Sequence, residues 1–354
     1  MELLLKNERF AGLIADNDLN IRFGVELQQD ASEVYYRRKA QVSIRLPMTT
    51  DLSEWERYLV ISPEDGATST FLSFDRSNQY MYWKWGENSN LDSLVKVHID
   101  YPQNKEVIYS PIHAEIDSIL YHPTDHTVLA VSENYHKPEL HVLNDTVRED
   151  LKYLINFRPN DPLSILAASL DMSVLLVTYT SPDKPYEIYV YNTNSKSIKH
   201  LLNLRPELKQ YSLYKQVGFA FRARDGMMLQ AYISLPLNVP LRTAVDVPEA
   251  DKGYAELGML PLIPQKMVVD VHGGPGSRNI YSFAPRNAWL TSRGYAVLQV
   301  NYRGSTGFGK QLTNAGNGEW GRKMHFDILD AVEFAVEKGI ANKFQIAIMG
   351  VQGG

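Results

Sequence analysis

A glycine-rich segment directly after a buried-looking run carries the strongest chemical signal in this chain. His272-Gly273-Gly274-Pro275-Gly276 follows the apolar run Met267–Val271. Glycines let the backbone turn sharply and let a substrate oxygen come close to peptide N–H groups. Donors aimed at developing negative charge are what an oxyanion hole requires. We therefore predict that Gly273 or Gly274, with His272 beside them, belongs to an oxyanion-hole loop; a plain Gly-rich turn is the alternative.

A second strand-to-glycine junction stands at the end of the sequence. The run Phe344–Met349 leads into Gly350-Val351-Gln352-Gly353-Gly354. A strand followed by a Gly-rich turn is where many hydrolases place a nucleophilic serine, in the pattern G-x-S-x-G. Gln352 has no nucleophilic chemistry, and no serine stands in this turn. The sequence thus predicts the setting of a nucleophile elbow without its nucleophile.

Two further motifs lie between these segments. Asn301–Gly309 reads NYRGSTGFG and Gly318–Gly321 reads GEWG. Tight packing of loops above a sheet explains most of these residues. Arg303 and Trp320 are our candidates for lining a substrate site, because polar and aromatic residues on such loops often do so.

The elements around these motifs alternate between strand and helix. An Asp225-Gly226 turn predicts a hairpin within residues 218–236. Short, nearly continuous apolar runs are typical of strands buried on both faces of a parallel sheet. These considerations predict strands at Met267–Val271, Tyr295–Val300 and Phe344–Met349, and helices at Ala288–Ser292 and Phe326–Lys338, with Gly339 just after the second helix. Such alternation predicts a parallel sheet covered by helices.

The first half repeats. Asp75, Pro123 and Asp171 lie in turns spaced 48 residues apart, each between two strand-like runs, and a weaker copy surrounds Ala15–Ile21. A period of about 40–50 residues with several short strands is typical of a β-propeller; a β-sandwich is the alternative. Four or five blades fit, which leaves open a propeller incomplete at its N-terminus. We predict a propeller-like domain at 1–212 and an α/β domain at 213–354.

Composition narrows the classes of function. The 354 residues include 36 basic and 41 acidic ones and no cysteine, which excludes a basic nucleic-acid surface and thiol chemistry. No apolar run is long enough to span a membrane. The spacing of the histidines fits no metal-ligand set, and no cofactor is implied. We expect a cytoplasmic protein, since the apolar start is too short for a secretory signal.

Together these motifs resemble the prolyl oligopeptidase family of serine peptidases, most closely its acylaminoacyl-peptidase and dipeptidyl-peptidase-like branch. The segments VVDVHGGPG, GYAVLQVNYRGSTGFG, GNGEWGRKMHFDILDAVEF and QIAIMG carry the resemblance over about residues 213–350. It implies a propeller over an α/β-hydrolase domain, a short peptide as substrate, and acyl transfer assisted by Gly273 or Gly274. His272 occupies the position of an oxyanion tyrosine in some relatives.

One departure from the family matters. Its members continue Gly-Gly-Ser-Tyr-Gly-Gly after the last strand, and the acid and histidine of the triad follow further downstream. Neither Asp327, Asp330 nor His272 matches those positions. We therefore expect the 354 residues to be a truncated or frameshifted form, inactive by themselves. A non-catalytic remnant or propeller binding module is the alternative, and a lipase or esterase shares the loop and sheet but lacks the propeller. The exposed edge of the last strand predicts self-association.

Overall fold

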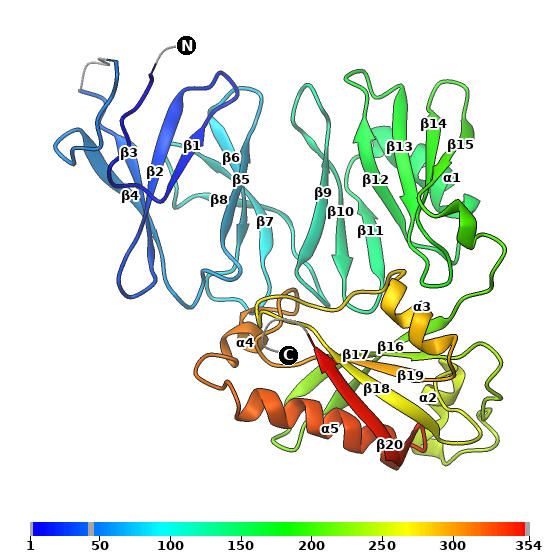
Figure 1. The fold of residues 1–354 in the computed structure, drawn as a ribbon. Helices are drawn as coiled ribbons and strands as arrows, with labels where there is room; N and C mark the ends of the chain where they lie inside the picture. Colours follow the sequence, from blue (N-terminus) through cyan, green and yellow to red (C-terminus); the bar gives the residue numbers. More distant parts are fainter. Residues whose placement is uncertain (1–2, 42–45, 351–354) are drawn as a thin grey trace. The chain divides into compact units, whose positions relative to one another are not determined.

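The computed structural model describes residues 3–41 and 46–350 (Figure 1). Contacts divide the chain into two compact units. One comprises Met1–Glu115 with Asp125–Thr127, and the other comprises Ile116–Thr124 with Val128–Gly354. The boundary predicted at 212/213 lies inside the second unit, before its last sheet, and stays a prediction.

The first unit consists of two four-stranded antiparallel sheets, each formed by strands in sequence order. The first sheet contains β1 (Gly12–Ala15), β2 (Ile21–Leu27), β3 (Glu33–Arg38) and β4 (Trp55–Ile61). The second contains β5 (Thr70–Phe74), β6 (Tyr80–Trp85), β7 (Ser93–His98) and β8 (Lys105–Tyr109). Aromatic and β-branched residues of both sheets, including Phe23, Tyr35 and Trp83, form a shared core.

The second unit begins with two more antiparallel sheets of the same kind. One contains β9 (Ile116–Tyr121), β10 (Val128–Asn134) and β11 (Pro138–Val142), and the next contains β12 (Leu163–Ala168), β13 (Val174–Tyr179), β14 (Glu187–Asn192) and β15 (Ser197–Asn203). Four successive blade-like sheets followed by an α/β sheet are the architecture that the sequence predicts.

The predicted repeat corresponds to one structural position. In each blade-like sheet, the turn between the first two strands contains a non-glycine residue with positive φ: Leu19, Asn78, His126 and Met172. The third copy is in a shifted register. Ser169, not Asp171, matches Asp75, because both residues begin the turn and accept a backbone hydrogen bond from the residue three positions later. The repeat is therefore real, and its last turn has the same length as the turn that begins at Asp75 but begins two residues earlier than the sequence alignment implies.

A helix that the sequence analysis did not predict interrupts the blade-like sheets. The helix α1 (Arg148–Phe157) lies between β11 and β12, and its Leu151 and Leu154 are fully buried. The short 3₁₀ turn η1 (Asp145–Val147) precedes it, and the Asn144 side chain caps this turn by accepting a hydrogen bond from Thr146 N at 3.0 Å. The Asn144-Asp145-Thr146 sequence is thus part of a helix start.

The chain then forms a mixed five-stranded sheet in the order β16-β17-β19-β18-β20. A hairpin of β16 (Lys215–Arg222) and β17 (Met228–Leu235) is joined antiparallel to β19 (Ala296–Asn301). The strands β18 (Gln265–Val271) and β20 (Ala341–Gly350) are parallel to β19. The hairpin and all three buried strands lie close to their predicted positions. This arrangement is the predicted N-terminal part of an α/β-hydrolase sheet.

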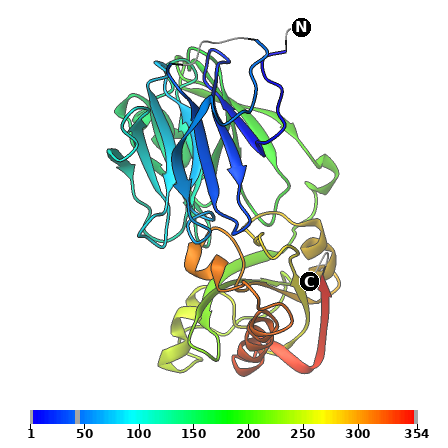
Figure 2. The same cartoon turned by 90° about the vertical axis from the view of Figure 1, so that its left-hand side faces the viewer.

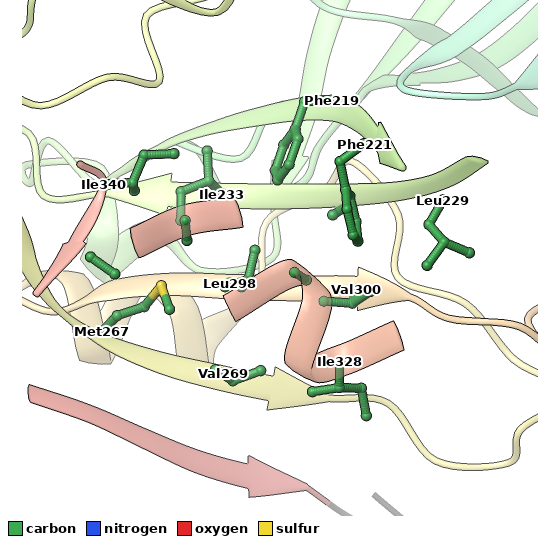
Figure 3. Close-up of a cluster of buried hydrophobic side chains, with 14 of the residues drawn as sticks. Phe219, Phe221, Leu229, Ile233, Met267, Val269, Leu298, Val300, Ile328 and Ile340 are labelled. Atoms are coloured by element: carbon green, nitrogen blue, oxygen red, sulfur yellow. The ribbon is translucent and has the colours of Figure 1, made fainter. Parts of the chain in front are cut away.

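Helices cover the sheet. The helix α5 (Lys323–Glu337) packs on an apolar face where Val269, Val300 and Ile328 meet (Figure 3). Gly339 follows α5 with φ of 69°, the left-handed conformation expected just after a helix. The shorter helices are α2 (Lys252–Glu256), α3 (Pro285–Thr291) and α4 (Lys310–Asn314); the 3₁₀ turns are η2 (Pro206–Leu208) and η3 (Glu249–Asp251). No helix of the described ranges is long and apolar enough to cross a membrane.

The strand β20 forms one edge of the described sheet (Figure 2). Two of its apolar side chains are strongly exposed: Phe344 is 84% and Ile348 is 64% accessible. An edge strand with unpaired backbone groups and apolar side chains favours pairing with another β-strand.

Candidate active site

The predicted oxyanion segment lies where three parallel strands end. The loop His272–Asn279, here called the β18 loop, follows β18 directly. Val271 pairs in parallel register with Gly350, the last residue of β20. The start of the predicted elbow therefore lies next to the start of the β18 loop. The elbow residues Val351–Gly354 themselves lie outside the described residues.

The β18 loop presents two backbone donors. Within residues 3–41 and 46–350, neither Gly273 nor Gly274 donates its N–H to another protein group. Gly274 has φ of 128°, and a Cβ at this position would lie 2.7 Å from Gly276 N. Only glycine fits this conformation without strain. Available donors on a glycine backbone are the arrangement that an oxyanion hole requires, although their catalytic role stays a prediction.

His272 is held on all sides. Its ring stacks on Tyr302 with centroids 4.5 Å apart. Its Nδ1 lies 3.0 Å from Gly273 O, and its Nε2 lies 2.9 Å from Ser305 Oγ. Burial lowers the pKa of His272 below its ordinary value, with smaller opposing effects from Gly273 O and Asp270. Each ring nitrogen lies within hydrogen-bond distance of an oxygen, Gly273 O for Nδ1 and Ser305 Oγ for Nε2.

The Ser305–His272 pair has the distance of a catalytic serine–histidine pair but not its setting. Ser305 is fully buried, and its Oγ lies 2.6 Å from Tyr302 O as well as near the His272 ring. A nucleophile must reach the substrate carbonyl. This hydroxyl is enclosed by its own loop, so the pair is structural.

Arg303 lies below the surface in an ion-pair network. It follows β19 in the segment Tyr302–Gly309, here called the β19 loop, and is 3% exposed. Its guanidinium donates to both carboxylate oxygens of Asp327 on α5 and to Asp225 at 2.9 and 3.1 Å. Hydrogen bonds with Asp327, then Asp225, raise the pKa of Arg303. A substrate-binding role for Arg303 stays a prediction, and these contacts favour bracing of the β19 loop.

Trp320 is placed differently. Its side chain is 64% exposed and lines a pocket of about 190 Å³. The pocket reaches Gly274 and Pro275 of the β18 loop and Ile348 of β20. The structure therefore brings Trp320 near the predicted oxyanion segment, while Arg303 faces α5. Its contact with substrate stays a prediction.

A buried polar network behind the β18 loop escaped the sequence analysis. Asn279 N donates to Asn301 Oδ1 at 2.7 Å, and Asn301 in turn donates to the Gln230 side chain. Gln230 Nε2 lies 3.2 Å from His136 Nδ1 on the β10–β11 turn. Asn301 and Gln230 occupy the face of the sheet opposite the apolar core. Amide residues alternating with apolar ones along β17 and β19 were the available signal.

Comparisons with known proteins agree with this geometry. Residues 281–354 match the family model described as the Prolyl oligopeptidase family. The chain is 54% identical over 350 residues to the "Dipeptidyl peptidase family member 6" of Caenorhabditis elegans, covering 99% of this chain and 47% of that protein. Over almost its whole length, the chain is therefore similar to a protein named as a dipeptidyl peptidase family member. The "Dipeptidyl aminopeptidase BIII" of Pseudoxanthomonas mexicana is 32% identical and is also covered to 47% of its length, with 98% of this chain aligned.

Solved structures of this family share the fold. A puromycin-hydrolyzing peptidase of Mycobacterium tuberculosis aligns with a TM-score of 0.69 at 18% identity, covering 98% of this chain and 49% of that one. A prolyl endopeptidase structure aligns with a TM-score of 0.61 at 15% identity, covering 94% and 45%. The chain spans about half the length of the curated relatives it matches. The propeller-like fold and the resemblance to the prolyl oligopeptidase family predicted from the sequence are confirmed.

Proposed function

We propose that these residues form the propeller-like part and the first half of the catalytic domain of a serine peptidase that releases dipeptides from short peptides. The names of two similar relatives, a dipeptidyl peptidase family member and a dipeptidyl aminopeptidase, support the dipeptidyl specificity. The observation that carries the proposal is the pair of N–H groups at Gly273 and Gly274, which have no acceptor among residues 3–41 and 46–350 and belong to the loop that begins next to the end of β20. Acyl transfer needs an oxyanion hole beside a nucleophile, and the parallel pairing of Val271 with Gly350 supports such an arrangement.

We further propose that a polypeptide of these 354 residues alone is inactive. Gln352 stands where the family has its serine. Ser305 cannot replace that serine, because it is fully buried. Without a nucleophile, only the residual contributions of binding and oxyanion donors remain. We also expect this polypeptide to self-associate through β20 and to be cytoplasmic, which sedimentation velocity and cell fractionation would test.

A chimera tests the proposal. Residues 1–349 would be joined to the complementary C-terminal half of the C. elegans relative, beginning at the position aligned with Gly350. We expect the chimera to hydrolyse dipeptidyl-coumarin amides that have a free N-terminus and to be labelled by a fluorophosphonate probe. The 354-residue polypeptide should do neither.

The outcomes separate the possible functions. Labelling of the 354-residue polypeptide would refute its inactivity. A folded chimera that cleaves coumarin esters but no peptide amide would favour an esterase. A folded chimera without any turnover would refute the peptidase proposal and leave a binding role. The same chimera with the transferred nucleophilic serine changed to alanine is the control for background hydrolysis.

A further inference from the structure

The two peptide units that present the Gly273 and Gly274 N–H groups are each fixed through their carbonyl oxygens. Tyr302 Oη donates to His272 O at 2.7 Å. His272 Nδ1 lies 3.0 Å from Gly273 O, within hydrogen-bond distance. Neither the 272–273 nor the 273–274 peptide bond is cis. In a trans peptide unit the C=O and N–H point in opposite directions, so a hydrogen bond to the oxygen also sets the direction of the nitrogen.

The groups that donate these hydrogen bonds are themselves fixed. Burial raises the pKa of Tyr302, so its hydroxyl keeps the proton that it donates. The His272 ring lies between the Tyr302 ring, on which it stacks, and Ser305 Oγ at its Nε2. Ser305 sits at the other end of the tight turn that begins with Tyr302, whose O accepts from Ser305 N at 3.0 Å.

We infer that Tyr302, His272 and Ser305 are positioning residues that orient the Gly273 and Gly274 N–H groups toward the oxyanion. Tyr302 sets the first peptide unit, His272 sets the second, and Ser305 holds the His272 ring. This inference rests on the proposed function, because it takes both glycine N–H groups as oxyanion donors. It gives the Ser305–His272 pair, which does not act as nucleophile and base, the role of holding the β18 loop in position.

The alternative is that these contacts only stabilise the fold. Both roles predict a loss of stability when a contact is removed. Only the positioning role predicts a selective loss of kcat, because oxyanion donors act on the transition state and a misplacement of about 1 Å can cost about 100-fold. A change in the environment of the Gly273 N–H can also be observed directly, as a shift of its amide resonance.

The experiment compares Tyr302→Phe and Ser305→Ala in the chimera described above. Tyr302→Phe keeps the stacked ring and removes only the hydroxyl. We expect kcat to fall about 10- to 100-fold with KM changed less than about threefold, and Ser305→Ala to have a smaller effect in the same direction. Tyr295→Phe is the matched control, since Tyr295 contacts Lys266 and lies away from the β18 loop. It should leave kcat unchanged.

A second measurement does not depend on activity. His272–Gly273 is the single His–Gly step in these 354 residues, so labelling histidine carbonyl carbon and glycine nitrogen identifies the Gly273 amide, with Gly273→Ala confirming the assignment. We expect Tyr302→Phe to shift this resonance and Tyr295→Phe to leave it in place. An unshifted resonance, or a kcat within twofold of the parent in both Tyr302→Phe and Ser305→Ala, would overturn the inference. If the parent chimera is inactive, the proposed function fails and the resonance alone decides the positioning.

Discussion

The β18 loop and the β19 loop both start at the carboxyl ends of neighbouring parallel strands, but they use their polar groups in opposite ways. In the β18 loop, Gly273 and Gly274 keep their N–H groups unused by the rest of the described chain. In the β19 loop, the guanidinium of Arg303 uses four of its five N–H groups in hydrogen bonds to Asp327 and Asp225. The β18 loop therefore keeps donors for a ligand, whereas the charged residue of the β19 loop spends most of its donors on partners within the fold.

The difference indicates that one loop offers hydrogen-bond donors and the other holds it in place. The β19 loop touches the β18 loop directly: Thr306 N donates to Ser277 O at 3.0 Å, and a Cβ on Gly304 would lie 3.0 Å from Pro275 Cβ. A loop that must keep N–H donors for a ligand cannot use them in its own hydrogen bonds, so contacts from a neighbouring loop have to hold its conformation. The bracing loop should then dominate stability, and the presenting loop should dominate catalysis.

The largest effect is expected at the brace. Asp327→Asn removes one charge from a pair in which both side chains are almost completely buried, at 4% and 0% exposure. The guanidinium of Arg303 then keeps only Asp225, which is 37% exposed, as its counter-charge. Removing one partner of a buried pair typically costs about 3–5 kcal/mol. We expect the free energy of unfolding of the chimera, measured by urea titration, to fall by about 3 kcal/mol.

Asp330→Asn is the matched control on the same helix. Asp330 pairs with Arg224, whose side chain is 52% exposed, so solvent replaces much of the lost interaction. Its loss of stability should be clearly smaller. Equal losses in the two variants would mean that burial of the Arg303–Asp327 pair is not what stabilises the β19 loop.

The second effect is expected in the presenting loop. Gly274→Ala forces a side chain into φ of 128° and against Gly276 N at 2.7 Å, which must reshape the loop. We expect kcat of the chimera to fall about 100-fold, the size reported for losing one oxyanion donor. Gly258→Ala is the control, because Gly258 also has positive φ but its nearest neighbour would be 3.7 Å away. Comparable losses of kcat in both variants would show general strain rather than a specific role of the β18 loop.

The strands and glycines of this region were predictable from the sequence, whereas the contacts between its two loops were not. The strands β18, β19 and β20 were predicted because strands buried on both faces appear as apolar runs, and the β18 loop because glycines and His272 stand together in the chain. The roles of Tyr302 and Ser305 were not predictable. Their contact with His272 arises from the pairing of β18 with β19, more than 25 residues later in the chain.

Arg303 illustrates the same limit. Its type and place predicted a polar residue near the site, but its partners Asp225 and Asp327 lie 78 and 24 residues away in sequence. Whether a loop arginine meets a substrate or a carboxylate depends on which helix packs beneath it. Local patterns report which residues are buried or which turn sharply, whereas pairing between distant segments is a property of the folded sheet.

The smallest expected effect is a difference between the two loops in how the free energy of unfolding depends on pH. Burial lowers the pKa of His272 below the unfolded value of 6.5, with Asp270 opposing and Arg278 adding to the shift. The unfolded chain then binds more protons, so this contribution to stability is complete above pH 6.5 and is lost as pH falls through the folded pKa. One such group changes the free energy of unfolding by at most about 1.4 kcal/mol per pH unit. We expect His272→Gln to flatten the pH dependence just below pH 6.5 in urea titrations of the chimera.

Asp225→Asn gives the contrasting result for the β19 loop. The hydrogen bond from Arg303 lowers the pKa of Asp225 below 3.8, so this carboxylate is ionised throughout the range in which His272 titrates. Removing it should lower stability by a constant amount between pH 5 and 7 and leave the slope unchanged. If His272→Gln kept the parent slope while Asp225→Asn altered it, the distinction between a titrating His272 and an Asp225 that stays ionised over this pH range would be wrong.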